Sequence, residues 1–110
     1  MLRQATRMAA KAGARGMAGA ARPRVALCLA GCGVYDGSET TEVVSAMIHL
    51  SPLCDVTCFA PNKDQHHVVD HTTGEDNNPT PRNVLVESAR IARGAVTDLA
   101  ELDVSQFDAL

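Results

Sequence analysis

Hydrophobic and polar positions follow one another along residues 25–60 in the order of a strand, a helix and a second strand. Residues 25–30 form a short continuous apolar run, which is typical of a strand buried on both faces of a parallel sheet. After a polar turn, apolar residues recur every three or four positions and predict one buried helical stripe, made of Val43, Ala46, Met47 and Leu50. Pro52 ends this helix, and residues 55–60 form the second strand. This order predicts a right-handed βαβ unit with parallel strands.

A long polar connection follows the second strand. Within residues 62–82, residues 67–72 are predicted to form a short strand or hairpin arm before a turn at Gly74. We predict that Thr80 caps the next helix and that Pro81 takes its first position, where a missing N–H costs nothing.

The second helix is predicted to run to about residue 93, because Gly94 stops it. Its inner face is predicted to consist of Val84, Leu85, Ser88, Ile91 and Ala92. Residues 96–102 indicate an irregular or single-turn connector. Residues 107–110 then begin another apolar run, which is shorter than the usual five or six residues of a strand.

The turn between the first strand and the first helix holds three glycines, Gly31, Gly33 and Gly37. Ligands of open α/β folds bind at the carboxyl ends of the strands, so this turn is the first candidate for a site. We predict that Ser38 or Asp36 caps the following helix.

Three known chemistries fit the glycine turn poorly. The spacing G-x-G-x-x-x-G is one residue longer than the dinucleotide fingerprint, and no acid ends the second strand to bind a ribose. No Gly-Lys-Ser/Thr follows, which excludes a Walker phosphate loop. Cys32 resembles the nucleophile of a strand-to-helix elbow, but the helix is predicted to start some six residues later. Glu39 and Glu42 are interpreted as capping acids at the positive end of the helix dipole, and the alternative is that one of them points into a pocket.

Charge divides the chain into two segments. Residues 1–24 carry six basic residues and no acid, whereas the remainder holds all 13 acids and four bases. A basic, alanine-rich and acid-free start predicts a mitochondrial transit peptide over residues 1–23, cleaved between residues 18 and 23. A nucleic-acid-binding arm or a plain tail is the alternative. We expect no membrane partner, because no window approaches about 18 consecutive apolar residues.

Four cysteines are spaced as two pairs four positions apart: Cys28, Cys32, Cys54 and Cys58. Residues four apart in a strand lie about 13 Å from each other. Zinc ligands must converge at about 2.3 Å from one ion. We therefore predict reduced, buried cysteines and no metal, and we interpret His66, His67 and His71 as surface residues of the loop.

Several unusual strings carry a resemblance to a known family. They read AGCGVYDGSE, FAP, VDHTTGE, RNVLVESARIARG and FDAL, in this order. Over residues 24–110 the chain resembles the ElbB-like family of the PfpI/ThiJ superfamily, whose animal members are mitochondrial. The resemblance implies a flavodoxin-like, doubly wound parallel α/β sheet that is truncated after its first strands. It also implies a location in the mitochondrial matrix, no cofactor and no nucleic-acid partner.

The resemblance further implies a divided active site. In this superfamily a reactive cysteine on a downstream elbow and a glycine-rich turn act with an acid on the first helix, which matches Glu39. Where the family usually has GSEIHE, this chain has GSETTE, so both acids are kept and the histidine is not. The pocket is expected to be lined by Gly31, Cys32, Gly33, Asp36 and Glu42.

We therefore expect no catalytic activity from these residues alone. A full-length form is expected to act on small carbonyl compounds such as reactive aldehydes, in the manner of a glyoxalase. The alternative is an interaction module that uses an open sheet edge, with a homo-oligomer as one product.

Overall fold

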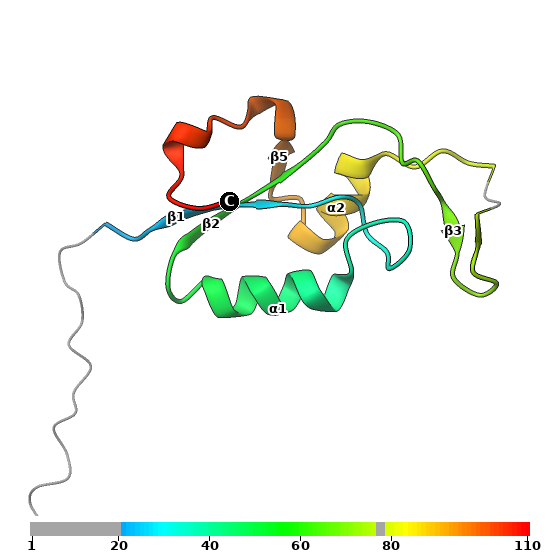
Figure 1. The fold of residues 1–110 in the computed structure, drawn as a ribbon, viewed down its shortest axis with the longest axis horizontal. Helices are drawn as coiled ribbons and strands as arrows, with labels where there is room; N and C mark the ends of the chain where they lie inside the picture. Colours follow the sequence, from blue (N-terminus) through cyan, green and yellow to red (C-terminus); the bar gives the residue numbers. More distant parts are fainter. Residues whose placement is uncertain (1–20, 77–78) are drawn as a thin grey trace, which may run out of the picture.

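The computed structural model describes residues 21–76 and 79–110, and Figure 1 shows how these residues are arranged. Most of the expected transit peptide therefore lies outside the described residues. A three-stranded parallel sheet has the order β1-β2-β5. Its strands are β1 (Arg24–Cys28), β2 (Asp55–Ala60) and β5 (Val96–Asp98). The connecting helices are α1 (Thr40–Leu50) and α2 (Val84–Ala92). The α/β class and the parallel βαβ unit are confirmed.

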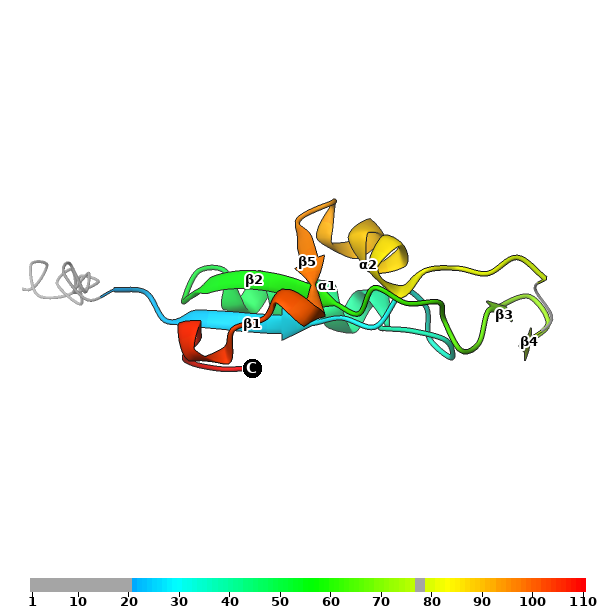
Figure 2. The same ribbon diagram turned by 90° about the horizontal axis from the view of Figure 1, so that it is seen from above.

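Both helices pack on the same face of the sheet. The core on this face consists of Leu29, Cys58, Ala60, Val84 and Ala92, with Leu27, Val43 and Met47 packed against it. Side chains alternate along a strand, so Phe59, between Cys58 and Ala60, points to the opposite face of the sheet. There its ring contacts the ring of Phe107 edge to face, with 5.5 Å between the ring centroids. The opposite face therefore meets the C-terminal segment, which contains the short turns η1 (Leu99–Glu101) and η2 (Val104–Gln106). Figures 1 and 2 show this segment and α1 on opposite sides of β1 and β2.

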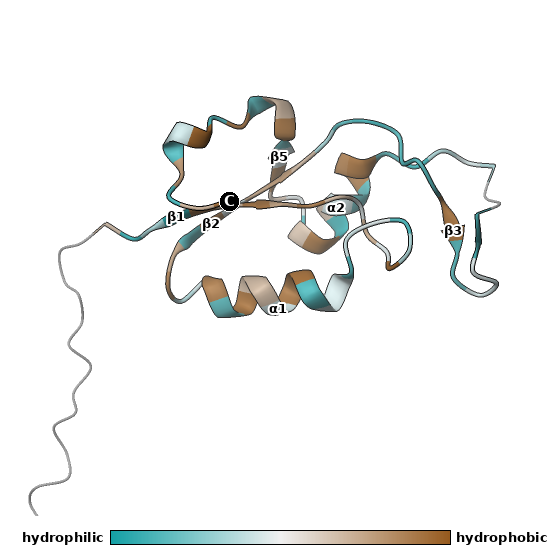
Figure 3. Cartoon of the chain, viewed as in Figure 1, coloured by the Kyte–Doolittle hydropathy of each residue, from teal (hydrophilic) through white to brown (hydrophobic). Residues whose placement is uncertain are grey.

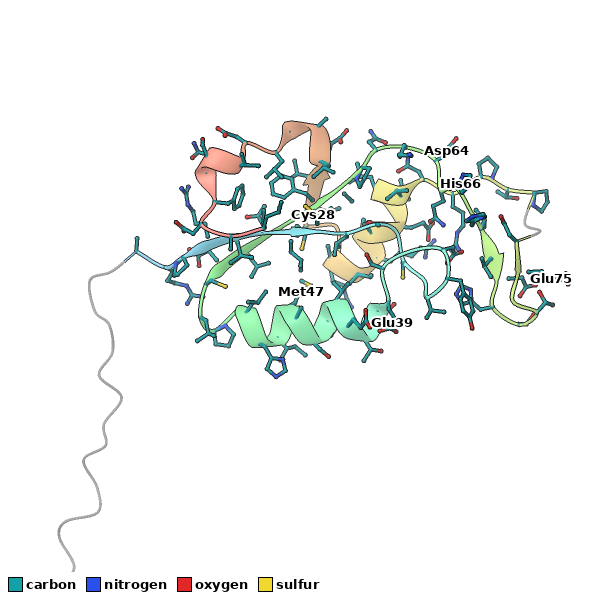
Figure 4. The ribbon with its side chains drawn as sticks, viewed as in Figure 1. Cys28, Glu39, Met47, Asp64, His66 and Glu75 are labelled. Carbon is teal, nitrogen blue, oxygen red and sulfur yellow. The ribbon has the colours of Figure 1, made fainter. Side chains whose placement is uncertain are left out.

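The predicted apolar stripe of α1 faces the core, as expected, because Val43 and Met47 contact it. No residue of α1 is fully buried, however, and Ile48 on its outer side is 62% exposed. Figure 4 shows Met47 on the side of α1 that faces the strands. In the described residues, no helix is both long and apolar enough to cross a membrane.

The prediction for residues 96–102 is wrong for the first three residues, which form β5, whereas the predicted single turn is present as η1. Val96 lies opposite Cys58 and Asp98 lies opposite Ala60 in the sheet. A three-residue strand is too short to show a period of its own, so only its partner β2 defines it. Residues 107–110 contribute a single parallel bridge between Ala109 and Val25 of β1.

Three residues predicted as caps do not cap the helices, because neither Ser38 nor Asp36 is the N-cap of α1 and Thr80 is not the N-cap of α2. Glu39 caps α1, and Asn83 caps α2 by accepting a hydrogen bond from the Val86 N–H at 3.1 Å. Since α2 begins at Val84, Pro81 lies before the helix. Good capping residues occur at several neighbouring positions, and long-range contacts decide which of them is used.

Two short strands, β3 (Val69–Asp70) and β4 (Glu75–Asp76), confirm the predicted hairpin and its turn at Gly74. Figure 3 shows that the chain between β2 and β3 is mostly hydrophilic, in contrast to the apolar strands of the sheet. The Asp76 carboxylate anchors this segment by accepting from the Val68 N–H at 2.9 Å and from His67 Nδ1 at 2.5 Å.

Helix α2 buries four of the five residues predicted for its inner face, while Leu85 is partly buried. It also buries Glu87, which the sequence pattern did not predict. Arg82 at 3.0 Å and Arg90 at 2.8 Å both contact one oxygen of the Glu87 carboxylate. Two guanidinium groups therefore compensate the buried negative charge.

Candidate functional site

The glycine turn lies at the carboxyl end of β1 and is closed by the residues that precede α1. Ser38 closes it twice, because its N–H donates to the Ala30 carbonyl at 3.0 Å and its Oγ accepts from the Ala30 N–H at 2.9 Å. The Gly33 N–H donates to the Ser38 carbonyl at 3.0 Å. Ser38 therefore closes the turn by hydrogen bonds to Ala30 and Gly33. Its hydroxyl is used in this contact, so it does not cap α1.

Two glycines are required by the geometry of this turn. Gly31 has φ = +81°, a backbone conformation that side chains disfavour. A Cβ at Gly37 would lie 2.7 Å from the Ala30 carbonyl oxygen and 2.8 Å from the Cys32 nitrogen. Both neighbours are backbone atoms, so they cannot move aside as a flexible side chain would. The turn therefore brings two backbone segments closer together than any larger residue allows.

Helix α2 contacts the turn through the side chain of Ser88. The buried Ser88 hydroxyl accepts a hydrogen bond from the Gly31 N–H at 2.9 Å and donates to the Val84 carbonyl at 2.7 Å. Ser88 was predicted only as an inner-face residue. Its polar role had no signal in the sequence, since a serine on a helix stripe is ordinary packing.

Asp36 ties the turn to the hairpin rather than to α1. Its side chain is fully buried, and Oδ2 accepts a hydrogen bond from the Val69 N–H at 2.7 Å. The other oxygen, Oδ1, is buried without a hydrogen-bond partner and lies 3.8 Å from His71 Nε2. Gln65 reinforces this junction because its Nε2 donates to the Asp36 carbonyl at 3.3 Å. Neither Gln65 nor the link to Val69 was predicted.

His71 lies between the hairpin and the tip of the turn. Its Nε2 accepts from the Val34 N–H at 3.3 Å, so Nδ1 carries the proton that is donated to the Val69 carbonyl at 3.0 Å. Its ring stacks on Tyr35 with 5.7 Å between centroids. His71 is exposed, as predicted for a residue on the surface of the loop. Its contacts with the turn, which hold the hairpin there, were not predicted.

Glu39 is the N-cap of α1. Its Oε2 accepts a hydrogen bond from the Glu42 N–H at 2.7 Å. The hydrogen bond from the Glu42 backbone, followed by that from Thr41, lowers the pKa of the Glu39 carboxyl. The predicted capping role of Glu39 is confirmed, and a further role in a pocket stays a prediction. Figure 4 shows Glu39 at the end of α1 next to the turn, and the side chain of Glu42 is exposed.

The four cysteines have different surroundings. Cys54 and Cys58 are buried as predicted, and burial raises the pKa of the Cys58 thiol. Cys28 is exposed, which contradicts the prediction, because it ends β1 on the face away from the helices. Cys32 is half-buried, and its sulfur lies 3.5 Å from the Thr40 Oγ1. Residues 21–76 and 79–110 contain no group of three or more His, Cys, Asp and Glu side chains that could hold a metal ion.

A separate cavity of about 180 Å³ lies on the opposite face of the sheet. It is lined by Ala26, Leu102, Val104, Phe107, Asp108, Ala109 and Leu110. None of the predicted site residues belongs to it. This cavity therefore lies apart from the glycine turn.

The bridge between Ala109 and Val25 shows why the turn is the natural place for a site. Residue 109 lies beside β1 on the side away from β2, so the chain crosses from β5 at one edge of the sheet to the opposite edge. Strand order reverses at β1, and such switch points place a crevice at the carboxyl ends of the strands. The glycine turn and Glu39 lie at this end of β1.

Comparison with known proteins agrees with this geometry, although no family model matches the chain. The mitochondrial ES1 protein homolog of Rattus norvegicus is 54% identical over 89 residues, which are 80% of this chain and 34% of the relative. The human mitochondrial glutamine amidotransferase-like class 1 domain-containing protein 3 is 54% identical over 87 residues, 78% of this chain and 32% of the relative. The chain is therefore similar to one part of the glutamine amidotransferase-like proteins. It spans about a third of the length of the curated relatives it matches.

A solved structure of another protein contains the same fold. An isoprenoid biosynthesis protein with an amidotransferase-like domain from Ehrlichia chaffeensis superposes with a TM-score of 0.74 and 49% sequence identity. The match covers 78% of this chain and 40% of that protein. The flavodoxin-like fold expected from the sequence is thereby confirmed.

The relatives also bear on location. The rat and human proteins are named as mitochondrial, and so is the ES1 protein of Danio rerio, which is 37% identical over 91 residues. The predicted mitochondrial location is confirmed for this chain. Its place in the matrix stays a prediction.

Proposed function

We propose that this chain provides the glycine-turn wall and the helix acid of a small-molecule site in a mitochondrial amidotransferase-like protein. The observation that carries the proposal is the position of the Glu39 carboxylate, which caps α1 beside the turn at the carboxyl end of β1. A lowered pKa keeps this carboxyl ionised at neutral pH, so it offers a fixed negative charge to a cationic or proton-donating partner.

The chemistry that suits such a wall is the addition of a thiol to a small reactive aldehyde. The sulfur forms a bond to the carbonyl carbon, and the carbonyl oxygen takes up a proton. Glu39 would orient the thiol or accept its proton. Cys32 does not fit the nucleophile, because its sulfur contacts Thr40 and no contact with Glu39 is present. The nucleophile and the oxyanion donors are therefore proposed to lie outside these 110 residues, and the chain alone is proposed to be inactive.

Turnover of glyoxal by the purified 110-residue chain tests this proposal. We expect no turnover above the buffer rate, and we expect turnover by the full-length human relative that falls when its matching glutamate becomes glutamine. Turnover by the 110-residue chain that disappears in Glu39→Gln would show that the site is complete without further residues.

A second candidate is an interaction module that forms a homo-oligomer. The sheet face opposite the helices favours it, since Val104 and Leu110 beside the cavity are 67% and 78% exposed. The β1 edge is less suited to pairing, because Ala109 already accepts from the Ala26 N–H at 3.0 Å. Size-exclusion chromatography with light scattering should then show a dimer that Leu110→Glu dissociates. A monomer at all concentrations excludes this candidate.

A further inference from the structure

Arg22 connects the segment before β1 to the end of α1 and the start of β2. Its Nη2 donates to the Ser51 carbonyl at 2.5 Å and to the Cys54 carbonyl at 2.7 Å. Its Nε donates to the Asp55 Oδ1 at 2.8 Å. One guanidinium group thus joins three residues that lie 29 to 33 positions away in the sequence.

One of these contacts satisfies the carbonyl of Ser51, the C-cap of α1, and another satisfies the carbonyl of Cys54 in the turn that leads to β2. The last carbonyls of a helix have no partner inside it and carry the negative end of the helix dipole. The Met47 carbonyl receives the Ser51 N–H, and the Leu50 carbonyl receives the N–H groups of Leu53 and Cys54. The Ser51 and Cys54 carbonyls receive Arg22 instead. A positive guanidinium is the favourable group at this end of α1.

Pro23 continues the pairing of the sheet beyond β1. Its carbonyl accepts a hydrogen bond from the Asp55 N–H at 2.8 Å, next to the pair formed by Arg24 and Asp55. Proline cannot donate to a sheet, but it can accept, and this contact uses only its carbonyl. Among the described residues, the hydrogen-bonded structure of the domain therefore extends to Arg22.

We propose that the mitochondrial leader is removed N-terminal to Arg22, so that Arg22 and Pro23 remain as the first structural residues of the mature protein. The cleavage hydrolyses one peptide bond with one water molecule, giving a carboxylate on the leader and an amino group on the mature chain. A leader that ended at residue 23 would instead remove the guanidinium from the end of α1 and the acceptor of the Asp55 N–H. This inference is independent of any reaction at the glycine turn.

The decisive experiment is import of the full 110-residue chain into isolated mitochondria. Mass spectrometry of the protected product then identifies its first residue. We expect a processed chain that begins at residue 22 or earlier. A product that begins at Pro23 or later overturns the proposal, and so does a chain that is imported without cleavage.

A matched pair of variants in the full chain tests the structural reason. Arg22→Gln removes the charge and most of the donors, and it should lower Tm by about 4 to 10 °C, the effect of one or two lost hydrogen bonds in a small domain. Arg24→Gln is the control, because the Arg24 side chain has one weak contact, at 3.5 Å to the Gln106 Oε1. It should shift Tm by less than about 2 °C. Failure of only the Arg22 variant to fold also supports the proposal, whereas equal behaviour of the two variants overturns it.

Discussion

The two ends of β1 are held by different kinds of contact. At the carboxyl end, backbone segments meet at Gly37, and the buried side chains of Asp36 and Ser88 bind backbone N–H groups. At the amino end, Arg22 has a side chain that is 47% exposed, and the Asp108 carboxylate accepts from the Arg24 N–H at 2.7 Å on the surface. The polar side chains that bind backbone groups at the first end are buried, whereas those at the second end are exposed.

This difference predicts how each end tolerates change. Water can replace a lost partner at the exposed end, so the loss costs little more than the contact itself. At the buried end a lost partner leaves a polar group unsatisfied, and an added atom has no free volume. The carboxyl end also keeps two buried acceptors without partners among the described residues, Asp36 Oδ1 and Gln65 Oε1. In folded proteins such groups are bound by ordered water, hold strain or belong to a functional site.

The largest effect is expected for Gly37→Ala. The added Cβ would lie under 3 Å from two backbone atoms, so the turn must open, at a cost of about 3 kcal/mol in the free energy of unfolding. Urea denaturation followed by circular dichroism measures this cost.

Gly74→Ala is the matched control. A Cβ at Gly74 has no atom within 4 Å, and only its φ of +76° is unfavourable. It should cost about 1 kcal/mol. If both variants lose the same stability, close approach at the glycine turn is not what requires Gly37.

The second largest effect is expected for Asp36→Ala. The variant leaves the buried Val69 N–H without its acceptor, which should cost about 2 kcal/mol and release the hairpin from the turn. Hydrogen exchange at the Val69 amide and urea denaturation measure the two consequences. Asp64→Ala, which changes an exposed carboxylate of the same loop, should leave both unchanged. Unaltered protection of Val69 in Asp36→Ala would contradict this assignment.

The sequence predicts the parts of the fold that depend on local pattern. β2 was predicted with its observed bounds, and the hairpin was predicted from Gly74 and its neighbours. β5 was missed because three residues carry no period, and its existence depends on pairing with β2. Ser38 and Asp36 were wrongly predicted as caps, since their side chains bind the Ala30 and Val69 N–H groups. Glu39, interpreted as a capping acid, is the residue that caps α1.

The sequence predicts where the candidate site lies, but it does not predict which distant residues contact it. The glycines and Glu39 were predicted to lie at the carboxyl end of the first strand, and they do. No pattern indicated that Gln65, Val69 and His71 return to this turn, because long loops fold by tertiary contacts rather than by period. Asp36 was the one residue of this contact that the sequence indicated, because aspartate is a common capping residue. The sequence predicted that it caps α1, but its carboxylate binds the Val69 N–H of the hairpin instead.

A smaller effect, confined to the hairpin, is expected on acidification. The pKa of Asp76 is lowered from its ordinary value of 3.8, first by the hydrogen bond from the Val68 N–H and then by His67. A carboxyl with a lowered pKa in the folded state stabilises the structure above its ordinary pKa, and this contribution disappears as the pH falls through the lowered value. Protection of the Val68 amide from hydrogen exchange should therefore be constant from pH 6 to about pH 4 and fall below it.

Asp76→Asn separates this contribution from general acid unfolding. The amide oxygen still accepts a hydrogen bond but has no charge to lose, so the pH dependence of Val68 protection below about pH 4 should flatten. An unchanged pH profile in Asp76→Asn would assign the dependence to another group.

The smallest effect on stability is expected for Glu39→Gln, which removes the negative charge of the side chain and keeps its capping hydrogen bond. The glutamine amide oxygen replaces Oε2 as acceptor of the Glu42 N–H, so the N-cap persists, and only the interaction of the negative charge with the helix dipole is lost. Tm should stay close to that of the parent chain, whereas Glu39→Ala, which removes the acceptor as well, should lower it measurably. Because the pKa of Glu39 is lowered from its ordinary value, the difference between parent and Glu39→Gln should persist at neutral pH and disappear only as the pH falls through the lowered pKa, where the parent carboxyl takes up a proton. A large loss of stability in Glu39→Gln at neutral pH would mean that the charge itself holds the turn, and that the carboxyl end of β1 depends on Glu39 as the amino end depends on Arg22.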